Sequence, residues 1–161
     1  MRGALFLNGV YESVLVEILR IQELLPEQIL YIQPYSRSRI AGLRTEPPSV
    51  EDPVQLLIST TKDLGWVTYT TEIVGWRNKR NIPIRTKRMI DCIIKTLQPR
   101  EEGLYERARG VECVNLLFVR RLKKLKEPLQ VEELRLTRHG RSPKGRRSTA
   151  GNWWYIDRVK L

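Results

Sequence analysis

The sequence predicts an α+β domain in which a curled sheet is surrounded by helices. Three observations lead to this class: strand-like apolar segments recur along the chain, two segments have helical spacing of apolar residues, and no unit is repeated. At 161 residues the chain can bury a sufficient core without disulfides. We therefore expect a single domain over residues 1–161.

The first helix is expected near the N-terminus. Asn8-Gly9 can cap it, its apolar residues from Val10 to Leu25 recur every three or four positions, and Pro26 fits its end. This pattern predicts a helical extension over residues 1–27, ahead of the strands.

The strands follow from β-branched and aromatic composition bounded by turn residues. A short Gly-containing turn joins the second and third of them, which predicts a hairpin. We expect strands at residues 28–33, 54–60, 66–76, 111–119 (continuing toward 125) and 153–159, helices at 35–43 and 82–97, a charged loop at 98–110, and a short turn-and-helix element at 128–134.

The charge of the chain points to a polyanionic partner. Lys and Arg number 29 against 18 Asp and Glu, which gives a formal net charge of +11 and a pI near 10.1. From residue 134 onward, eight cationic residues face Asp157 alone, a local charge of +7. Nucleic acid is the commonest polyanion that such a protein meets. A basic tail without function is the alternative, and the aromatic residues that follow the arginines argue against it.

Metal, cofactor and membrane functions find no support in the sequence. Cys92 and Cys113 lie in apolar contexts without CxxC spacing, and His139 is the single histidine. We expect no metal and no cofactor, free thiols in a reducing cytoplasm, and no membrane association, because no segment reaches the roughly 18 apolar residues of a membrane span.

Groups for catalysis are few. His139 stands in a basic Gly-containing loop without an adjacent nucleophile, and the paired carboxylates of Glu101-Glu102 and Glu132-Glu133 point apart. No phosphate-binding glycine motif is present. We expect no enzymatic activity, with a nuclease or RNA-processing role through His139 as the least favoured alternative.

Aromatic residues beside cations favour nucleic-acid binding. Trp66 and Trp76 flank one predicted strand, and Trp153-Trp154 follow the arginines. Such rings stack on bases, although a core position is the common alternative for each of them. Tyr35, Trp66, Tyr69 and Trp76 are the candidate walls of a stacking pocket. Strict alternation places Trp66 and Trp76 on one face of the strand and Tyr69 on the other, unless a bulge intervenes.

Cations in predicted loops and at a helix start suit backbone phosphates. This predicts a phosphate-binding set of Arg37, Arg39, Arg138, Lys144, Arg146 and Arg147.

Three segments carry a resemblance to a known superfamily. They are the strand Leu56-Leu57-Ile58-Ser59-Thr60, the strand Tyr69-Thr70-Thr71-Glu72-Ile73-Val74-Gly75, and the run from Val114 through Arg120-Arg121-Leu122 to Pro128 and Val131-Glu132-Glu133-Leu134. Together they resemble the PUA-like superfamily, and within it the EVE and YTH-type domains. The likeness covers residues 29–134, but Tyr31-Ile32-Gln33-Pro34 replaces the Lys-Ser-Glu-Pro entry motif of EVE proteins, and a long helix precedes it.

The resemblance implies a partly open β-barrel over residues 28–161, with a basic C-terminal loop and a closing strand. It further implies an aromatic pocket that takes a flipped, modified base, as in stand-alone readers and modification-dependent restriction systems. Carried over by position, the pocket residues are Gln33, Tyr35, Ser59, Thr60, Trp66 and Trp76.

These observations favour a non-enzymatic nucleic-acid-binding domain that reads a modified or flipped base in DNA or RNA. The alternative is a basic adaptor or structural protein that binds RNA or an acidic protein without base readout. Whether Trp153 and Trp154 lie in the core or face a ligand, and the oligomeric state, stay open.

Overall fold

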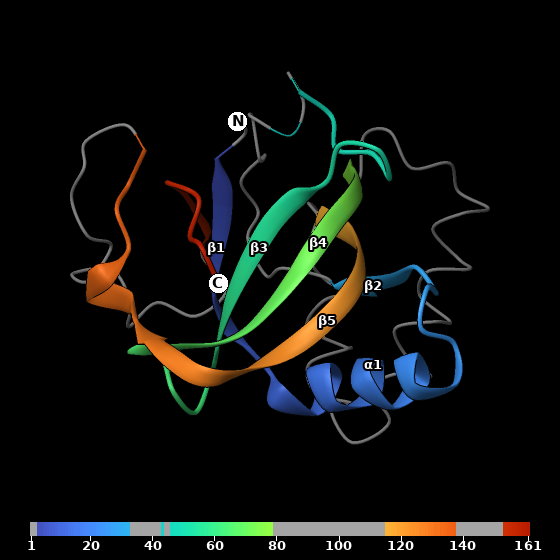
Figure 1. Ribbon diagram of the computed structural model, residues 1–161, viewed down its shortest axis with the longest axis horizontal. Coiled ribbons are helices and arrows are strands. Elements are labelled where there is room, and N and C mark those ends of the chain that lie inside the picture. The colour runs from blue at the N-terminus through green and yellow to red at the C-terminus, as the bar shows by residue number, and fades with distance from the viewer. Residues whose placement is uncertain (1–2, 33–42, 44–45, 79–114, 138–152) are drawn as a thin grey trace.

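The computed structural model describes residues 3–32, 43, 46–78, 115–137 and 153–161. Within them one mixed sheet has the strand order β2-β5-β4-β3-β1-β6. Its strands are β1 (Ala4–Val10), β2 (Leu30–Ile32), β3 (Val54–Thr60), β4 (Trp66–Asn78), β5 (Asn115–Gln130) and β6 (Trp153–Ile156), accompanied by the helix α1 (Glu12–Leu24) and the short 3-10 helix η1 (Val131–Glu133) (Figure 1).

β1 lies inside the sheet, between β3 and β6, in a stretch that we expected to be a helical extension. It pairs in parallel with β3 and antiparallel with β6. Leu5 and Leu7 pack on one face of the sheet while Ala4 and Phe6 pack on the other. Because both faces are covered, β1 has an almost continuous apolar sequence without the alternation that marks a half-exposed strand.

The predicted first helix is present but shorter, since it begins at Glu12 rather than after Asn8-Gly9. Gly9 adopts a positive φ of 79° at a register shift between β1 and β3, so Asn8-Gly9 forms a bulge instead of a helix cap. The helix buries Val14, Leu15 and Ile18 against the sheet.

The hairpin of β3 and β4 is confirmed, with antiparallel register from Val54↔Ile73 to Ile58↔Tyr69. β2 confirms the predicted strand at 28–33 as a three-residue piece. β5 continues to Gln130, so the expected turn-and-helix element is reduced to η1, and β6 ends at Ile156, three residues before the predicted end. The helices expected at 35–43 and 82–97 and the loop at 98–110 lie outside the described residues, except for the buried Leu43.

The sheet is curled and not fully closed. β5 bends strongly around the other strands in Figure 1, and after η1 the chain returns so that Leu136 forms a bridge with Ile156 of β6. β2 and β6, at the two ends of the strand order, do not pair with each other in the described part. The predicted α+β class with a partly open, curled sheet is therefore confirmed.

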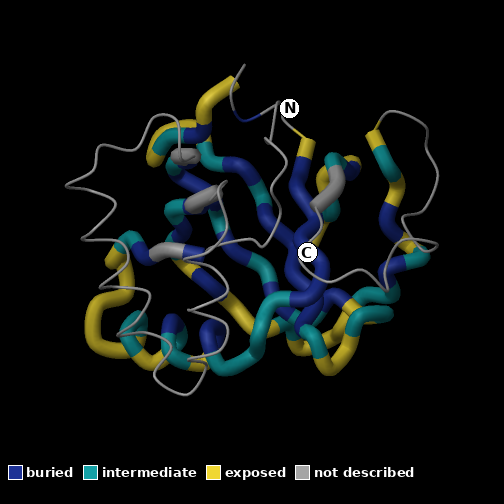
Figure 2. Tube along the Cα trace, turned by 180° about the vertical axis from the view of Figure 1, so that it is seen from behind, coloured by how far each residue is buried: buried dark blue, intermediate teal, exposed yellow. Residues whose placement is uncertain are grey.

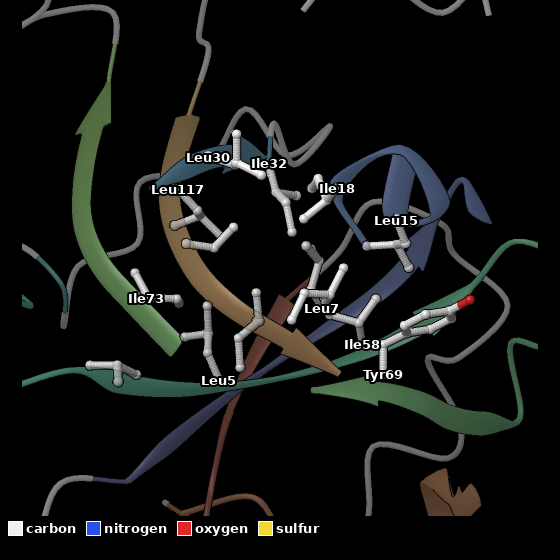
Figure 3. Close-up of a cluster of buried hydrophobic side chains, with 14 of the residues drawn as sticks. Leu5, Leu7, Leu15, Ile18, Leu30, Ile32, Ile58, Tyr69, Ile73 and Leu117 are labelled. Atoms are coloured by element: carbon white, nitrogen blue, oxygen red, sulfur yellow. The ribbon is translucent and has the colours of Figure 1, made fainter. Parts of the chain in front are cut away.

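Two hydrophobic clusters lie on opposite faces of this sheet. We call the face that packs on α1 the helix-side face; it carries Leu5, Leu7, Ile58 and Tyr69, shown in Figure 3. The other, here the far face, carries Phe6, Leu57, Val67 and Ile156 and is covered by the segment after the β5 bend. Figure 2 shows that the buried stretches follow the strands through the middle of the molecule.

Candidate nucleic-acid interface

The described residues of the predicted pocket are Ser59, Thr60, Trp66 and Trp76, and they do not form one pocket. Trp66 and Trp76 are ten residues apart on β4, about 30 Å along an extended strand. Trp76 is 6% exposed and belongs to the helix-side core, whereas Trp66 is 42% exposed. Gln33 and Tyr35 lie outside the described residues, as do all six predicted phosphate-binding residues.

Irregular pairing in β4 changes the expected orientation of its rings. Register shifts with β5 occur between Val67 and Tyr69 and between Ile73 and Gly75. As a result Trp76 packs in the same helix-side cluster as Tyr69, although strict alternation predicted opposite faces. Val67 packs on the far face, so its neighbour Trp66 also points to the helix side. All three rings therefore share one face, and Trp66 is the exposed one.

The side chain of Ser59 is buried and makes internal hydrogen bonds. Its Oγ donates a hydrogen bond to Asn8 Oδ1 (2.5 Å) and accepts one from the Gly9 N–H (3.2 Å), and the residue has no exposed surface. These bonds hold the β1 bulge against the end of β3. Ser59 thus stabilises the scaffold and is not available to a base.

The end of the β3–β4 hairpin brings Thr60 and Trp66 together across the turn. Asp63 N–H donates to Thr60 O, and Trp66 N–H donates to Asp63 O. The buried Thr60 Oγ1 and Thr68 Oγ1 have no hydrogen-bond partner in the described part of the chain. Trp66 lies directly opposite Gln130 of β5.

β5 leaves the regular ladder beside this site. Tyr69 pairs with Lys124 and Val67 pairs with Leu129, so four residues of β5 face the single residue Thr68. We call residues 125–128 the β5 arch. A second irregularity lies around Arg121, which has a φ of 55°.

The sequence between Arg120 and Lys126 places five cations on β5, and three of them contact carboxylates. Arg120 Nε lies 2.7 Å from Glu72 Oε2, and its guanidinium also donates to Val50 O. Arg121 contacts Glu27 at 3.2 Å and Glu72 at 3.7 Å. The hydrogen bond to Glu27 is the main reason that the pKa of Arg121 is raised. These arginines therefore connect β5 to its neighbours.

Lys124 belongs to a three-residue contact at the start of α1. The Tyr69 hydroxyl donates to Glu12 Oε1 at 3.0 Å, and Lys124 Nζ lies 3.8 Å from the same oxygen and 5.8 Å from the Tyr69 ring centroid. The side chain of Lys124 is nevertheless 63% exposed. Its ammonium group can still meet a ligand.

Lys123 and Lys126 are both exposed, and neither has an ion pair with any described carboxylate. The predicted phosphate contacts lie in loops and at a helix start, and they do not include these lysines or Lys124. The available signal was the run Arg120-Arg121-Leu122-Lys123-Lys124-Leu125-Lys126 itself, in which cations alternate with core leucines.

Two negative findings hold for the described residues. None of their helices is long and apolar enough to cross a membrane. They also contain no group of three or more His, Cys, Asp or Glu that could hold a metal ion.

Comparison with known proteins yields structural neighbours only. No protein-family model and no curated protein matches the chain. It is similar to the crystal structure of ASCH from Zymomonas mobilis, with 9% identity over 99% of this chain and 100% of that chain and a TM-score of 0.47. A tyrosine-to-phenylalanine mutant of ZmASCH from the same organism is 11% identical over 82% of this chain and 78% of that chain, with a TM-score of 0.41.

Both neighbours are named as ASCH, and they do not confirm the EVE or YTH type of the resemblance seen in the sequence. With TM-scores below 0.5, the likeness carries no conclusion about the family or the function of this chain.

Proposed function

We propose that this chain is a non-enzymatic nucleic-acid-binding domain of the PUA-like kind. The observation that carries the proposal is the exposed Trp66 at the start of β4. It points to the helix-side face, beside the cationic strand β5, in a chain of net charge +11. An exposed indole offers a stacking surface to any base, and nearby ammonium groups neutralise phosphates.

We further propose that the domain reads a flipped or modified base, which stacks on Trp66. Thr60 Oγ1, across the turn, lacks a partner in the described residues, but it is buried as Ser59 is, so this proposal rests on the exposed Trp66. Stacking on one aromatic ring contributes about 1–3 kcal/mol, which offsets the few kcal/mol needed to flip a weakened base. In this proposal Trp76 supports the fold instead of lining the pocket.

Tryptophan fluorescence titration tests the proposal. The ligands are short single- and double-stranded DNA and RNA, each with and without a methylated base, at salt concentrations of about 50 and 200 mM. We expect quenching that weakens with salt, and a preference for one modified oligonucleotide that Trp66→Ala removes. No detectable binding near 50 mM salt, where phosphate contacts dominate, would contradict the proposal.

The second candidate is a basic adaptor that binds RNA or an acidic protein without base readout. Lys123 and Lys126, which lack described ion pairs, favour it because they suit any polyanion. The same titration separates the two: Trp66→Ala leaves an adaptor's affinity unchanged and weakens a base reader about fivefold or more. A nuclease role depends on His139, which lies outside the described residues, and the non-enzymatic assignment stays a prediction.

A further inference from the structure

We propose that the helix-side face of the β5 arch is the phosphate-contacting surface for a single-stranded nucleic acid whose base stacks on Trp66. Lys126 of the arch and Lys124, which lies just before it, supply the charge. This inference rests on the proposed function and deepens it, because it assigns the backbone contacts to one face of one strand.

Lys126 lies in the arch, between the β5 residues that pair with Tyr69 and Val67. From Lys124 to Leu129, β5 has five residue steps, about 16 Å if extended, whereas their partners Tyr69 and Val67 are two steps apart, about 7 Å. The longer segment must therefore bow out of the ladder between its two ends. Lys126 stands near its middle, four residues before Gln130, the partner of Trp66.

Alternation places Lys126 and Trp66 on the same face. Leu122 packs in the helix-side cluster, while Leu125 and Leu129 pack against the far-face cluster. Leu122 and Lys124, which contacts Glu12, therefore point to the helix side, and Lys126, which follows the far-side Leu125, is assigned to the same side. Lys123 belongs to the opposite set and points to the far side.

The two faces of β5 thus carry nearly equivalent lysines with different neighbours. Lys123 and Lys126 are both exposed, and both lack an ion pair in the described part of the chain. Lys126 shares its face with the exposed indole of Trp66 and with Lys124, whereas no exposed aromatic residue of the described part adjoins Lys123. Aromatic and cationic groups on one face form the pattern that binds nucleic acid.

The occupant that fits this face is a single strand. A base can stack on an indole only after it has left the base stack, and a single strand offers such a base without the cost of unpairing. Stacked nucleotides advance about 3.4 Å along a strand, so we expect Trp66, Lys126 and Lys124 to span a few nucleotides.

The test compares charge reversal on the two faces of the same strand. Lys126→Glu and Lys123→Glu each lower the net charge from +11 to +9, so they change the overall field equally. Binding of oligothymidylate and oligouridylate is measured by fluorescence at about 50 mM salt, after circular dichroism and denaturant unfolding show intact folds. We expect Lys126→Glu to weaken binding about tenfold, and Lys123→Glu less than about threefold because water and salt screen it.

The salt dependence of the binding affinity provides a second measurement. Neutralising one phosphate contact to a single strand accounts for a slope of about −0.7 in log K against log salt, so Lys126→Gln should make the slope less steep by about that amount. Lys126→Gln also tests the phosphate contact if Lys126→Glu does not fold.

Equal effects of the two reversals, or no effect of either Lys126 variant, would overturn the inference while leaving the proposed function in place. Equal affinity for a duplex of the same length would overturn the single-strand assignment. Absence of binding by the unaltered chain would overturn the proposed function as well.

Discussion

Tyr69 is one side chain that connects three elements of the fold. It stands on β4, its hydroxyl donates to Glu12 of α1, and Lys124 of β5 lies against its ring. Burial raises the pKa of Tyr69 to about 12, and the hydrogen bond and negative charge of Glu12 add to this shift. Because the neutral form is favoured in the folded state, the contact stabilises the fold as long as Tyr69 keeps its proton.

Tyr69→Phe tests this contact through the pH dependence of unfolding. The folded pKa of about 12 exceeds the ordinary value of 10.0, so the stabilisation is complete below pH 10 and is lost as the pH rises toward 12. We expect the difference in unfolding free energy between the native chain and Tyr69→Phe to shrink by about 1 kcal/mol between pH 9 and 11. Denaturant unfolding at both pH values measures it, and a constant difference would contradict the assignment.

Single residues also show where sequence reasoning reached its limit. Trp66 and Trp76 were equivalent by alternation, yet one is exposed and the other is in the core. Alternation fails here because bulges depend on the partner strand, which lies far away in the sequence. The prediction that Trp66 takes part in the site stays in the proposal, whereas Ser59 and Trp76 are held by internal contacts.

The side chain of Gln22 links α1 to β5, because its amide bonds both backbone groups of Leu122 as a neighbouring strand would. Gln22 Nε2 donates to Leu122 O at 3.0 Å, and Leu122 N–H donates to Gln22 Oε1 at 2.8 Å. β2 begins at Leu30, opposite Val119, so within the described residues this strand does not extend beside Leu122. Gln22 therefore satisfies both backbone groups just after the irregular Arg121.

Gln22→Ala should destabilise the fold by about 1–3 kcal/mol, because two part-buried backbone groups lose their partners. Gln28→Ala is the control, since its amide makes one exposed bond of 3.3 Å to Ile29 O, and we expect a change within about 0.5 kcal/mol. Chemical denaturation of both variants gives the two values. Equal unfolding midpoints for Gln22→Ala and the native chain would refute the role of this amide.

The elements that the sequence predicted well have strong local signals. The hairpin of β3 and β4 combines strand composition with a short turn, and α1 has a clear apolar stripe. β1 was missed because a strand that is buried on both faces lacks alternation, and because Asn8-Gly9 fits a helix cap as well as a bulge. The length of β5 and its arch depend on pairing with β4, which no local pattern encodes.

On the scale of the whole molecule, curling of the sheet sets which charges act together. The bend of β5 returns the chain to β6 through the bridge between Leu136 and Ile156, and the segment after β6 lies on β3, where Gln55 bonds both backbone groups of Val159. The exposed cations Arg158 and Lys160 flank Val159. They belong to the same positive field as β5 but to a different element.

The general electrostatic field of the protein and a local contact have different effects on the rates of binding. Arg158→Glu with Lys160→Glu lowers the net charge from +11 to +7, a larger change than Lys126→Glu, without touching the β5 arch. Long-range attraction speeds encounter, whereas direct contacts retain the bound ligand. For a short single strand we therefore expect the double variant to slow association several-fold at about 50 mM salt with little change in dissociation, and Lys126→Glu mainly to speed dissociation. Stopped-flow fluorescence separates the two rates. Faster dissociation from the double variant would show that the segment after β6 touches the ligand, and the contact surface would then extend beyond one face of β5.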